Sequence, residues 1–179
     1  MTERSVDIVI LGGGSGGYAA AIRASELGKR VVLIEKDKVG GTCLHRGCIP
    51  TKALLHAAEV ADHVRSAGTV GVTAQLQGID PAGVTAYREG IVAKKYKGLE
   101  GLLKARGIEV VAGSGRLMSD GAVAVGDAIY RGADVVLATG SYSRTLPGLE
   151  IGGRVLTSEG ALALDVVPER VIVLGGGVI

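Results

Sequence analysis

The stretch Val6-Asp7-Ile8-Val9-Ile10-Leu11-Gly12-Gly13-Gly14-Ser15-Gly16-Gly17 decides the fold of this chain. Its first half is a near-continuous apolar run, which is typical of a strand buried on both faces of a parallel sheet. Its second half contains the pattern Gly12-x-Gly14-x-x-Gly17, directly before a run of helix formers. Glycines at this spacing allow a tight strand-to-helix turn and let backbone N–H groups approach a pyrophosphate at the helix start.

The following residues complete a β-α-β unit. Helix formers predict a helix over residues 18–27, and Gly28 stands where a left-handed C-cap is favoured. Residues 30–34 predict a second strand, which Glu35 ends. An acidic residue there can accept hydrogen bonds from ribose hydroxyls, and its charge disfavours a 2′-phosphate. An ordinary strand-helix turn with a solvated strand end is the alternative, but the combination favours a dinucleotide, either FAD or NAD.

Composition excludes several classes of protein. The chain has 179 residues, 47% of them hydrophobic, which suffices for one domain and the beginning of a second. Trp and Phe are absent, so the sequence offers no aromatic platform for single-stranded nucleic acid. The formal charge of +2 comes from scattered basic residues rather than a basic cluster. No export signal or membrane span is recognisable, so we expect a cytoplasmic protein without nucleic-acid or membrane partners.

The rest of the pattern predicts an α/β fold, with a parallel sheet, flanking helices and a small antiparallel meander, over about residues 1–150. Pro50 suits the first turn of a helix over residues 51–66, and Pro81 opens a second long helix that ends near Gly107. Short β-type runs at residues 108–112 and 122–125 predict the meander, and residues 133–138 a buried strand.

Residues 151–179 are predicted to form a linker and the start of a second domain. A short helical stretch is expected around residues 158–164. The last nine residues, Val171-Ile172-Val173-Leu174-Gly175-Gly176-Gly177-Val178-Ile179, repeat the strand-and-glycine pattern of the beginning. We therefore expect the first strand of a truncated NAD-binding domain there.

Two cysteines stand close together in Gly40-Gly41-Thr42-Cys43-Leu44-His45-Arg46-Gly47-Cys48-Ile49-Pro50-Thr51-Lys52. In a reducing compartment such a pair is more often catalytic or metal-binding than a structural disulfide. A disulfide needs Cα atoms about 4.4–6.8 Å apart, whereas residues five apart in a regular helix are separated by about 8.6 Å. A bridge would therefore need a distorted chain, for which Gly47 supplies backbone freedom.

The surroundings of the pair favour redox chemistry. A helix that starts near Pro50 would direct its positive end at Cys48 and lower the pKa of that thiol. Zinc is the alternative, with His45 as a third ligand, but no second Cys or His cluster follows at finger-like spacing. We predict a redox pair and no metal site.

The cysteine segment resembles the redox-disulfide signature of the pyridine nucleotide-disulfide oxidoreductases. Cys-Leu-x-x-Gly-Cys-Ile-Pro-Thr-Lys is similar to the dihydrolipoyl dehydrogenase branch rather than to glutathione or mercuric reductases. The resemblance covers the whole chain, and its further motifs are Tyr130-Arg131-Gly132-Ala133-Asp134, Ala138-Thr139-Gly140-Ser141 and Gly175-Gly176-Gly177. The proline that many relatives carry after Ala-Thr-Gly-Ser is missing, which puts the local turn in doubt.

The resemblance implies an FAD site, with the pyrophosphate over the first glycine cluster, a ribose at Glu35 and the adenine at Gly115. Gly113 is equally available to the adenine by spacing. The cofactor-binding residues implied are Gly12, Gly14, Gly17, Glu35, Lys36, Gly41, Thr42, Lys52, Gly115, Thr139, Gly140 and Ser141.

The resemblance also implies the reaction. Dihydrolipoyl groups on an acyltransferase of 2-oxoacid dehydrogenase complexes would reduce a Cys43–Cys48 disulfide, from which electrons pass to FAD and then to NAD. Cys43 would exchange with substrate, and Cys48 would face the flavin. The family's catalytic His-Glu pair would lie beyond Ile179, in a full-length homodimer. The alternatives are a mycothiol or glutathione-type disulfide reductase and a cofactor-binding fragment without turnover.

Overall fold

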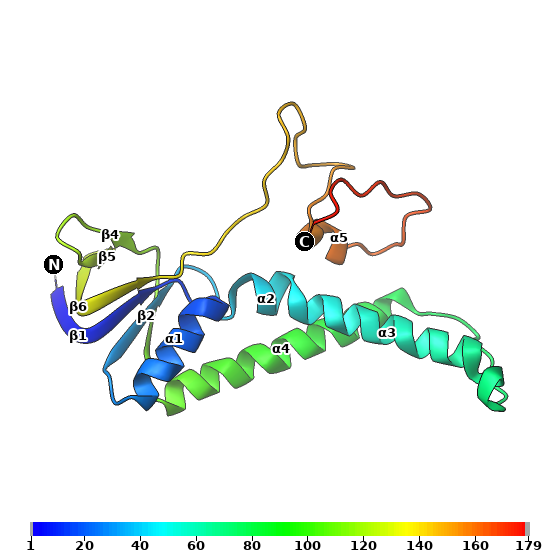
Figure 1. The fold of residues 1–179 in the computed structure, drawn as a ribbon, viewed down its shortest axis with the longest axis horizontal. Coiled ribbons are helices and arrows are strands. Elements are labelled where there is room, and N and C mark those ends of the chain that lie inside the picture. The colour runs from blue at the N-terminus through cyan, green and yellow to red at the C-terminus, as the bar shows by residue number, and fades with distance from the viewer. Residues whose placement is uncertain (1, 178–179) are drawn as a thin grey trace.

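The structure is a computed structural model that describes residues 2–177, and it confirms an α/β fold (Figure 1). The elements in chain order are β1 (Thr2–Leu11), α1 (Ser15–Glu26), β2 (Val31–Glu35), α2 (Gly41–Arg46), α3 (Cys48–Ser66), η1 (Ala67–Val70), α4 (Pro81–Ala105), β3 (Glu109–Ala112), β4 (Arg116–Leu117), β5 (Val123–Val125), β6 (Ala128–Leu137) and α5 (Ser158–Leu162).

The six strands form one sheet in the order β3-β2-β1-β6-β5-β4. The first four run parallel, and β6, β5 and β4 form an antiparallel meander. Leu11 pairs with Ile34 of β2 and with Leu137 of β6, so the carboxyl ends of the three central strands meet at one edge. This is the edge at which open α/β sheets bind ligands.

Each face of the sheet carries its own apolar core. On one face Ile10 and Leu33 pack with Ala21 of α1 and Leu103 of α4, all of them buried. The core on the other face is smaller. There the fully buried Val9, Val32 and Ile34 pack against residues of the meander. Burial on both faces explains why the strand over residues 6–11 reads as an apolar run.

Glycines end both helices that cover the first face, as the sequence predicts. Gly28, at φ +74°, follows α1. Its N–H bonds Ser25 O at 2.9 Å, and the next N–H bonds Ala24 O at 3.0 Å. Gly107 (φ +67°) ends α4 through the same pair of bonds. Each is a Schellman motif, which satisfies the last carbonyl groups of the helix and turns the chain into the next strand.

Helix starts depart slightly from the prediction. α1 begins at Ser15, inside the glycine cluster, and α3 begins at Cys48 rather than Thr51. Thr51 N donates to Gly47 O at 3.0 Å, so the helical bonds of α3 already start at Gly47. Pro50 lies in the first turn, as expected, and Pro81 is the first residue of α4 with Asp80 as its cap.

The prediction that residues 108–112 belong to the antiparallel meander is wrong. β3 is an edge strand of the main sheet and runs parallel to β2, with Leu33 opposite Val110. The reason is the crossover: α4 returns the chain to the end at which β2 begins, so the next strand must run parallel.

The strand predicted over residues 133–138 is longer and less buried than expected. β6 starts at Ala128, so it pairs with β5 in its first part and with β1 throughout. Tyr130 is 6% exposed, whereas Leu137 at the other end is 58% exposed. Position along the strand decides its burial, which a local apolar pattern does not reveal.

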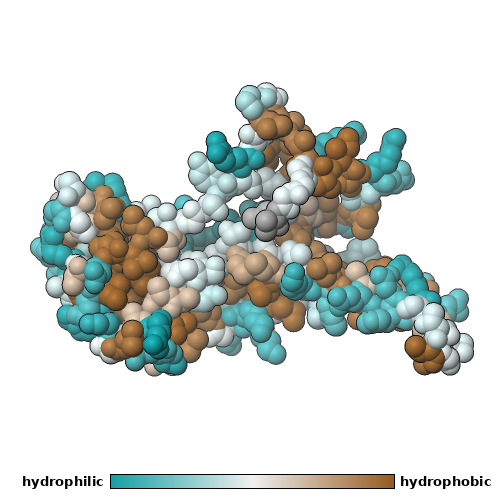
Figure 2. Space-filling view, in the orientation of Figure 1, coloured by the Kyte–Doolittle hydropathy of each residue, from teal (hydrophilic) through white to brown (hydrophobic). Residues whose placement is uncertain are grey.

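α3 and α4 extend from the sheet as a pair, and the segment after β6 returns above them to α5 (Figure 1). Hydrophilic side chains cover much of the helical pair, while apolar side chains gather over the segment that follows β6 (Figure 2). Val167 and Ile172 there are 96% and 93% exposed. Residues 171–176 form no strand, because no strand lies beside them within residues 2–177. Val178 and Ile179 lie outside the described residues.

Candidate dinucleotide and redox site

The turn between β1 and α1 can be built only with glycine at two positions. Gly12 has φ +106°, and a Cβ there would lie 2.1 Å from Ala138 O. A Cβ on Gly17 would lie 1.8 Å from Gly12 O. At Gly14, by contrast, a Cβ would meet its nearest neighbour, Gly41 Cα, at 4.0 Å. The two outer glycines therefore serve the fold, and the middle one borders open space.

The same turn presents the start of α1. Gly14 is its N-cap, and among the described residues no side chain caps the helix there. The first turn also contains no acidic residue. The first N–H groups of a helix lack partners within the helix and attract anions. Open space beside free N–H groups suits a pyrophosphate.

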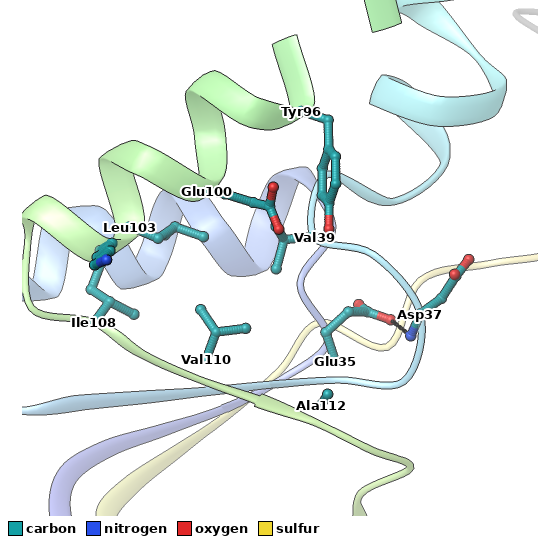
Figure 3. A pocket seen from close by; sticks show the side chains of 10 residues that line it. Glu35, Asp37, Val39, Tyr96, Glu100, Leu103, Ile108, Val110 and Ala112 are labelled. Atoms are coloured by element: carbon teal, nitrogen blue, oxygen red, sulfur yellow. Dashed lines mark hydrogen bonds between the residues drawn. The ribbon is translucent and has the colours of Figure 1, made fainter. Parts of the chain in front are cut away.

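Glu35 is held at the end of β2, facing the glycine turn. Gly13 N donates to Glu35 Oε2 at 2.6 Å. Asp37 N donates to Glu35 Oε1 at 2.9 Å (Figure 3). Each carboxylate oxygen keeps further acceptor capacity. The carboxylate is thus fixed in place and can still receive ribose hydroxyls.

A cavity of about 420 Å³ opens beside Glu35, between the strand ends and α4 (Figure 3). Its floor is apolar and its rim carries carboxylates; the lining includes Glu35, Asp37, Val39, Tyr96, Glu100 and Leu103. The pKa of the Tyr96 phenol is raised, mainly by a hydrogen bond to Glu100 and to a smaller extent by burial and nearby negative charge. Tyr96 and Glu100 lie in the middle of a long helix, where no sequence pattern distinguishes them.

Two glycines bring the cysteine segment against this turn. Gly40 (φ +109°) donates its N–H to Gly13 O at 2.8 Å. Gly41 (φ +56°) approaches so closely that a Cβ would lie 2.7 Å from Gly14 Cα. Thr42 follows as an exposed residue of α2. The glycine turn between β1 and α1 is therefore in direct contact with the start of the cysteine segment.

The chain is distorted between the cysteines, at the residue that the sequence indicates. Gly47 (φ −140°, ψ −108°) separates α2 from α3. Cys43 is half-buried on α2, and Cys48 is exposed as the first residue of α3. Both thiols are free. The pKa of the Cys43 thiol is raised, mainly by a hydrogen bond to Cys48 and to a smaller extent by burial and nearby charge.

The other predicted site residues lie around this centre. Ala138 N donates to Leu11 O at 2.8 Å. The exposed Thr139, Gly140 and Ser141 therefore leave the sheet at the edge where Gly12 lies. Lys36 and Lys52 are exposed, and the contacts within residues 2–177 assign a role to neither.

Gly115 and Gly113 both reach the edge of the sheet at which the parallel strands end. A Cβ on Gly115 would lie 2.4 Å from Leu11 Cδ1, and Gly113 N donates to Glu35 O at 2.8 Å. The structure therefore keeps both residues as candidates for the adenine contact.

These residues fit a dinucleotide better than a metal ion. The fixed acceptor at Glu35, the open space at Gly14 and the free helix start match ribose and pyrophosphate groups. Within residues 2–177, no group of three or more His, Cys, Asp or Glu side chains is arranged to hold a metal.

No helix within residues 2–177 is long and apolar enough to cross a bilayer.

Comparisons with known proteins agree with this arrangement. Residues 6–179 match the family described as pyridine nucleotide-disulphide oxidoreductase. Dihydrolipoyl dehydrogenase 2 of Haloarcula marismortui is 41% identical over 97% of this chain and 38% of that protein. Dihydrolipoyl dehydrogenase of Bacillus subtilis is 43% identical, over 97% of this chain and 40% of that protein.

A solved structure of another protein has a similar fold over this part of its chain. LpdA from Mycobacterium tuberculosis superposes with a TM-score of 0.76 and 26% identity, over 94% of this chain and 38% of that one. The chain thus spans 38–40% of the length of these three relatives.

Proposed function

The chain belongs to the pyridine nucleotide-disulphide oxidoreductase family, and on that premise we propose that it is the FAD-binding, disulfide-carrying part of a dihydrolipoyl dehydrogenase. Residues 1–150 bind FAD and carry the cysteine pair. Residues 151–179 lead into an NAD-binding domain. The two dehydrogenases at 41% and 43% identity support this branch of the family.

The observation that carries the proposal is the contact between the two motifs. The backbones of Gly14 and Gly41 touch, so the cysteine-bearing helix α2 starts where the pyrophosphate would bind. A cofactor anchored over Gly14 and at Glu35 would therefore run directly to the cysteine pair. Dinucleotide binding or a thiol pair alone would not require this contact.

The residues divide the work of binding. The N–H groups at the start of α1 would hold the pyrophosphate, and the Glu35 carboxylate would accept the ribose hydroxyls. Thr42 and Lys52 would lie along the path toward the flavin. Gly115 or Gly113 would meet the adenine, and the segment Thr139-Gly140-Ser141 would close over the cofactor at the end of β6.

The cysteine pair would exchange with a dithiol substrate. A thiolate of the dihydrolipoyl group attacks Cys43 Sγ, the Cys43–Cys48 bond breaks, and Cys48 leaves as a thiolate. The second substrate thiol then displaces Cys43, and the substrate departs as a disulfide. Two electrons and two protons thus pass from the substrate to the cysteine pair. Bound FAD supplies the two-electron acceptor that returns the pair to a disulfide.

The different surroundings of the two cysteines support unequal roles. Cys48 is exposed as the first residue of the 19-residue helix α3. The hydrogen bond to Cys48 and burial raise the pKa of Cys43, so Cys43 retains its proton more readily. This favours Cys48 as the leaving thiolate and the neighbour of the flavin, and Cys43 as the sulfur that meets substrate.

The remaining parts of the proposal concern the whole enzyme. NAD receives the electrons, the physiological substrate is a dihydrolipoyl group on an acyltransferase of 2-oxoacid dehydrogenase complexes, and the enzyme works as a cytoplasmic homodimer. The catalytic His-Glu pair of the family would come from residues beyond Ile179.

The test is a substrate comparison with the full-length protein. Its NAD-linked oxidation of dihydrolipoamide should exceed its reduction of glutathione or mycothiol disulfides by orders of magnitude. A preference for either disulfide would move the protein to that branch of the family. A colourless purified protein that takes up no added FAD would contradict the cofactor assignment itself.

A further inference from the structure

In the view of Figure 1, α5 lies above the junction of α2 and α3. Arginines from α2 and α4 contact it. Arg46 comes from α2 and Arg88 from α4. Neither belongs to the nucleotide site or to the cysteine pair. Their contacts indicate why α5 lies where it does.

Arg88 is the less exposed of the two. Its side chain is 14% exposed, whereas that of Arg46 is 43% exposed. Its Nη1 donates to the carbonyl of Leu162, the last residue of α5, and its Nη2 lies 3.3 Å from Glu89 Oε1. The last carbonyl groups of a helix lack partners within the helix. Arg88 therefore satisfies an α5 carbonyl while its own charge is compensated.

Arg46 holds the other end of α5. Its Nη1 lies 3.6 Å from Glu159 Oε1, and its Nη2 donates to Asp37 Oδ2 at 2.5 Å. One guanidinium thus joins α5 to the connection between β2 and α2. α2 has only six residues between two glycine caps, so contacts of this kind add to those that hold its start against the glycine turn.

An open hollow of about 410 Å³ lies between the three helices. The residues that surround it from α2, α4 and α5 include His45, Arg46, Arg88, Tyr96, Glu159 and Leu162. His45 also packs edge-on against Tyr96, at 5.2 Å between ring centroids. The end of α2 is therefore in contact with α4 on one side and with α5 on the other.

We propose that Arg88 and Arg46 clamp α5 onto α2 and α4, and that the clamped α5 positions α2, and with it Cys43, relative to Cys48. Arg88 and Arg46 are then positioning residues for the disulfide. The proposal rests on the proposed function in one respect: it takes Cys43 and Cys48 as a pair that forms a disulfide. It requires neither FAD nor turnover.

The clamp itself is tested by amide hydrogen exchange of residues 158–163 in the full chain. Arg88→Met should accelerate their exchange about tenfold, because a hydrogen bond to a charged group is lost. Arg88→Lys should recover part of the protection. Arg65→Met is the matched control, since Arg65 forms an exposed ion pair with Asp62 inside α3 and should leave α5 unchanged. Unaltered exchange in Arg88→Met would overturn the proposal.

Glu159→Gln provides a milder variant in case Arg88→Met does not fold. Glu159 is an exposed partner of Arg46, so the acceleration should reach at most about fivefold. Double substitution with Arg46→Gln should then add little, because both single changes break the same ion pair. Full additivity, or no effect of either change, would count against the clamp.

The positioning role is tested by equilibrating the cysteine pair with dithiothreitol. The two protein thiols lose two electrons and two protons as their S–S bond forms, and oxidised dithiothreitol takes them up. A disulfide demands a narrow range of Cα separations, so a loosened α2 should lower the equilibrium constant. We expect a decrease of up to about fivefold in Arg88→Met and Glu159→Gln. Within residues 2–177, Arg88 and Glu159 form no hydrogen bond or ion pair with either cysteine.

The outcomes separate the two proposals. Faster exchange of α5 with an unchanged equilibrium constant would mean that α5 is docked without positioning α2, and the inference would fail. A wild-type protein that forms no disulfide at all would instead refute the proposed function. Arg65→Met should match the wild type in both measurements.

Discussion

Within one turn, Gly17 and its neighbour Gly16 face opposite constraints. A Cβ on Gly17 would lie 1.8 Å from a backbone oxygen, whereas nothing lies within 4 Å of one on Gly16. We expect Gly17→Ala to lower the free energy of unfolding by at least about 2 kcal/mol and to abolish FAD binding, because the β1–α1 turn must open. Gly16→Ala should be neutral or stabilise by up to about 1 kcal/mol. Urea denaturation of both variants checks this, and equal effects would contradict it.

Glu35 combines two tasks, which two substitutions can separate. Its carboxylate orders the glycine turn through Gly13 N and would accept ribose hydroxyls. Glu35→Ala should weaken FAD binding by about 1.5–3 kcal/mol, because charge-assisted hydrogen bonds are lost. Glu35→Gln keeps an acceptor of similar shape and should lose less. Flavin-fluorescence titration measures both, and an unchanged dissociation constant in Glu35→Ala would refute the ribose assignment.

The two cysteines should exchange their order of reactivity when the cofactor binds. In reduced, flavin-free protein, Cys48 is exposed, while Cys43 is half-buried with a raised pKa. A bulky maleimide should therefore label Cys48 first. With FAD bound, the ring should cover Cys48, and Cys43 should react first despite its raised pKa.

Alkylation followed over time by peptide mass spectrometry distinguishes the cysteines. Cys43→Ser and Cys48→Ser verify the assignment of each labelled peptide. Faster labelling of Cys48 in the FAD-loaded protein would show that the proposed roles are reversed.

At the scale of elements, an ion pair joins β1 to the start of β2. Asp7 Oδ2 accepts from Arg30 N at 2.7 Å, and Arg30 Nη2 lies 3.1 Å from Asp7 Oδ1. The side-chain and backbone hydrogen bonds from Arg30 lower the pKa of Asp7. A lowered pKa in the folded state contributes stability above the unfolded pKa of about 3.9, and this contribution is lost as the pH falls through the folded value.

Asp7→Asn should therefore remove a pH-dependent part of the stability. The wild type should be more stable than the variant near pH 6, and the difference should shrink below about pH 4. Urea denaturation across this range gives the comparison. A difference that stays constant with pH would show that Asp7 stabilises the protein by other means than its charge.

Elements whose ends are set by local chemistry could be predicted from the sequence, and those set by distant partners could not. Pro81 and Gly107 bound α4 because a cap and a left-handed glycine act within one turn. The direction of β3 depends on the crossover through α4, and the length of β6 on its pairing with the first half of β1. No local pattern contains that information.

The same distinction applies to the site. The glycine turn, Glu35 and the cysteine segment are local motifs, and the structure brings them together. Tyr96 and Arg88 reach their cavities only because α4 packs against α2. An amphipathic helix contains many such residues, so only the packing of the helices identifies these two.

At the scale of the whole molecule, the last segment exposes apolar surface that the described residues do not cover. Val167, Ile172 and Val173 are 96%, 93% and 80% exposed, and residues 171–176 form no strand. In an apolar run with this β-type pattern, the backbone groups would be satisfied by a neighbouring strand. The proposed nucleotide site, by contrast, would be built from β1, β2, β6 and α1, all within residues 2–177.

We therefore expect a protein limited to residues 1–179 to bind FAD without NAD-linked turnover of dihydrolipoamide. Its glycine turn, Glu35 and cysteine pair are complete, but the proposed reaction also needs a nicotinamide site and a His-Glu pair, which we place beyond Ile179. Absorbance of the purified protein near 450 nm would report bound flavin, and reduction of added NAD would report turnover. Reduction of the Cys43–Cys48 pair by dihydrolipoamide should persist, since it requires only the thiols described above. Measurable NAD reduction by residues 1–179 alone would show that this chain contains a catalytic base that the present assignment lacks.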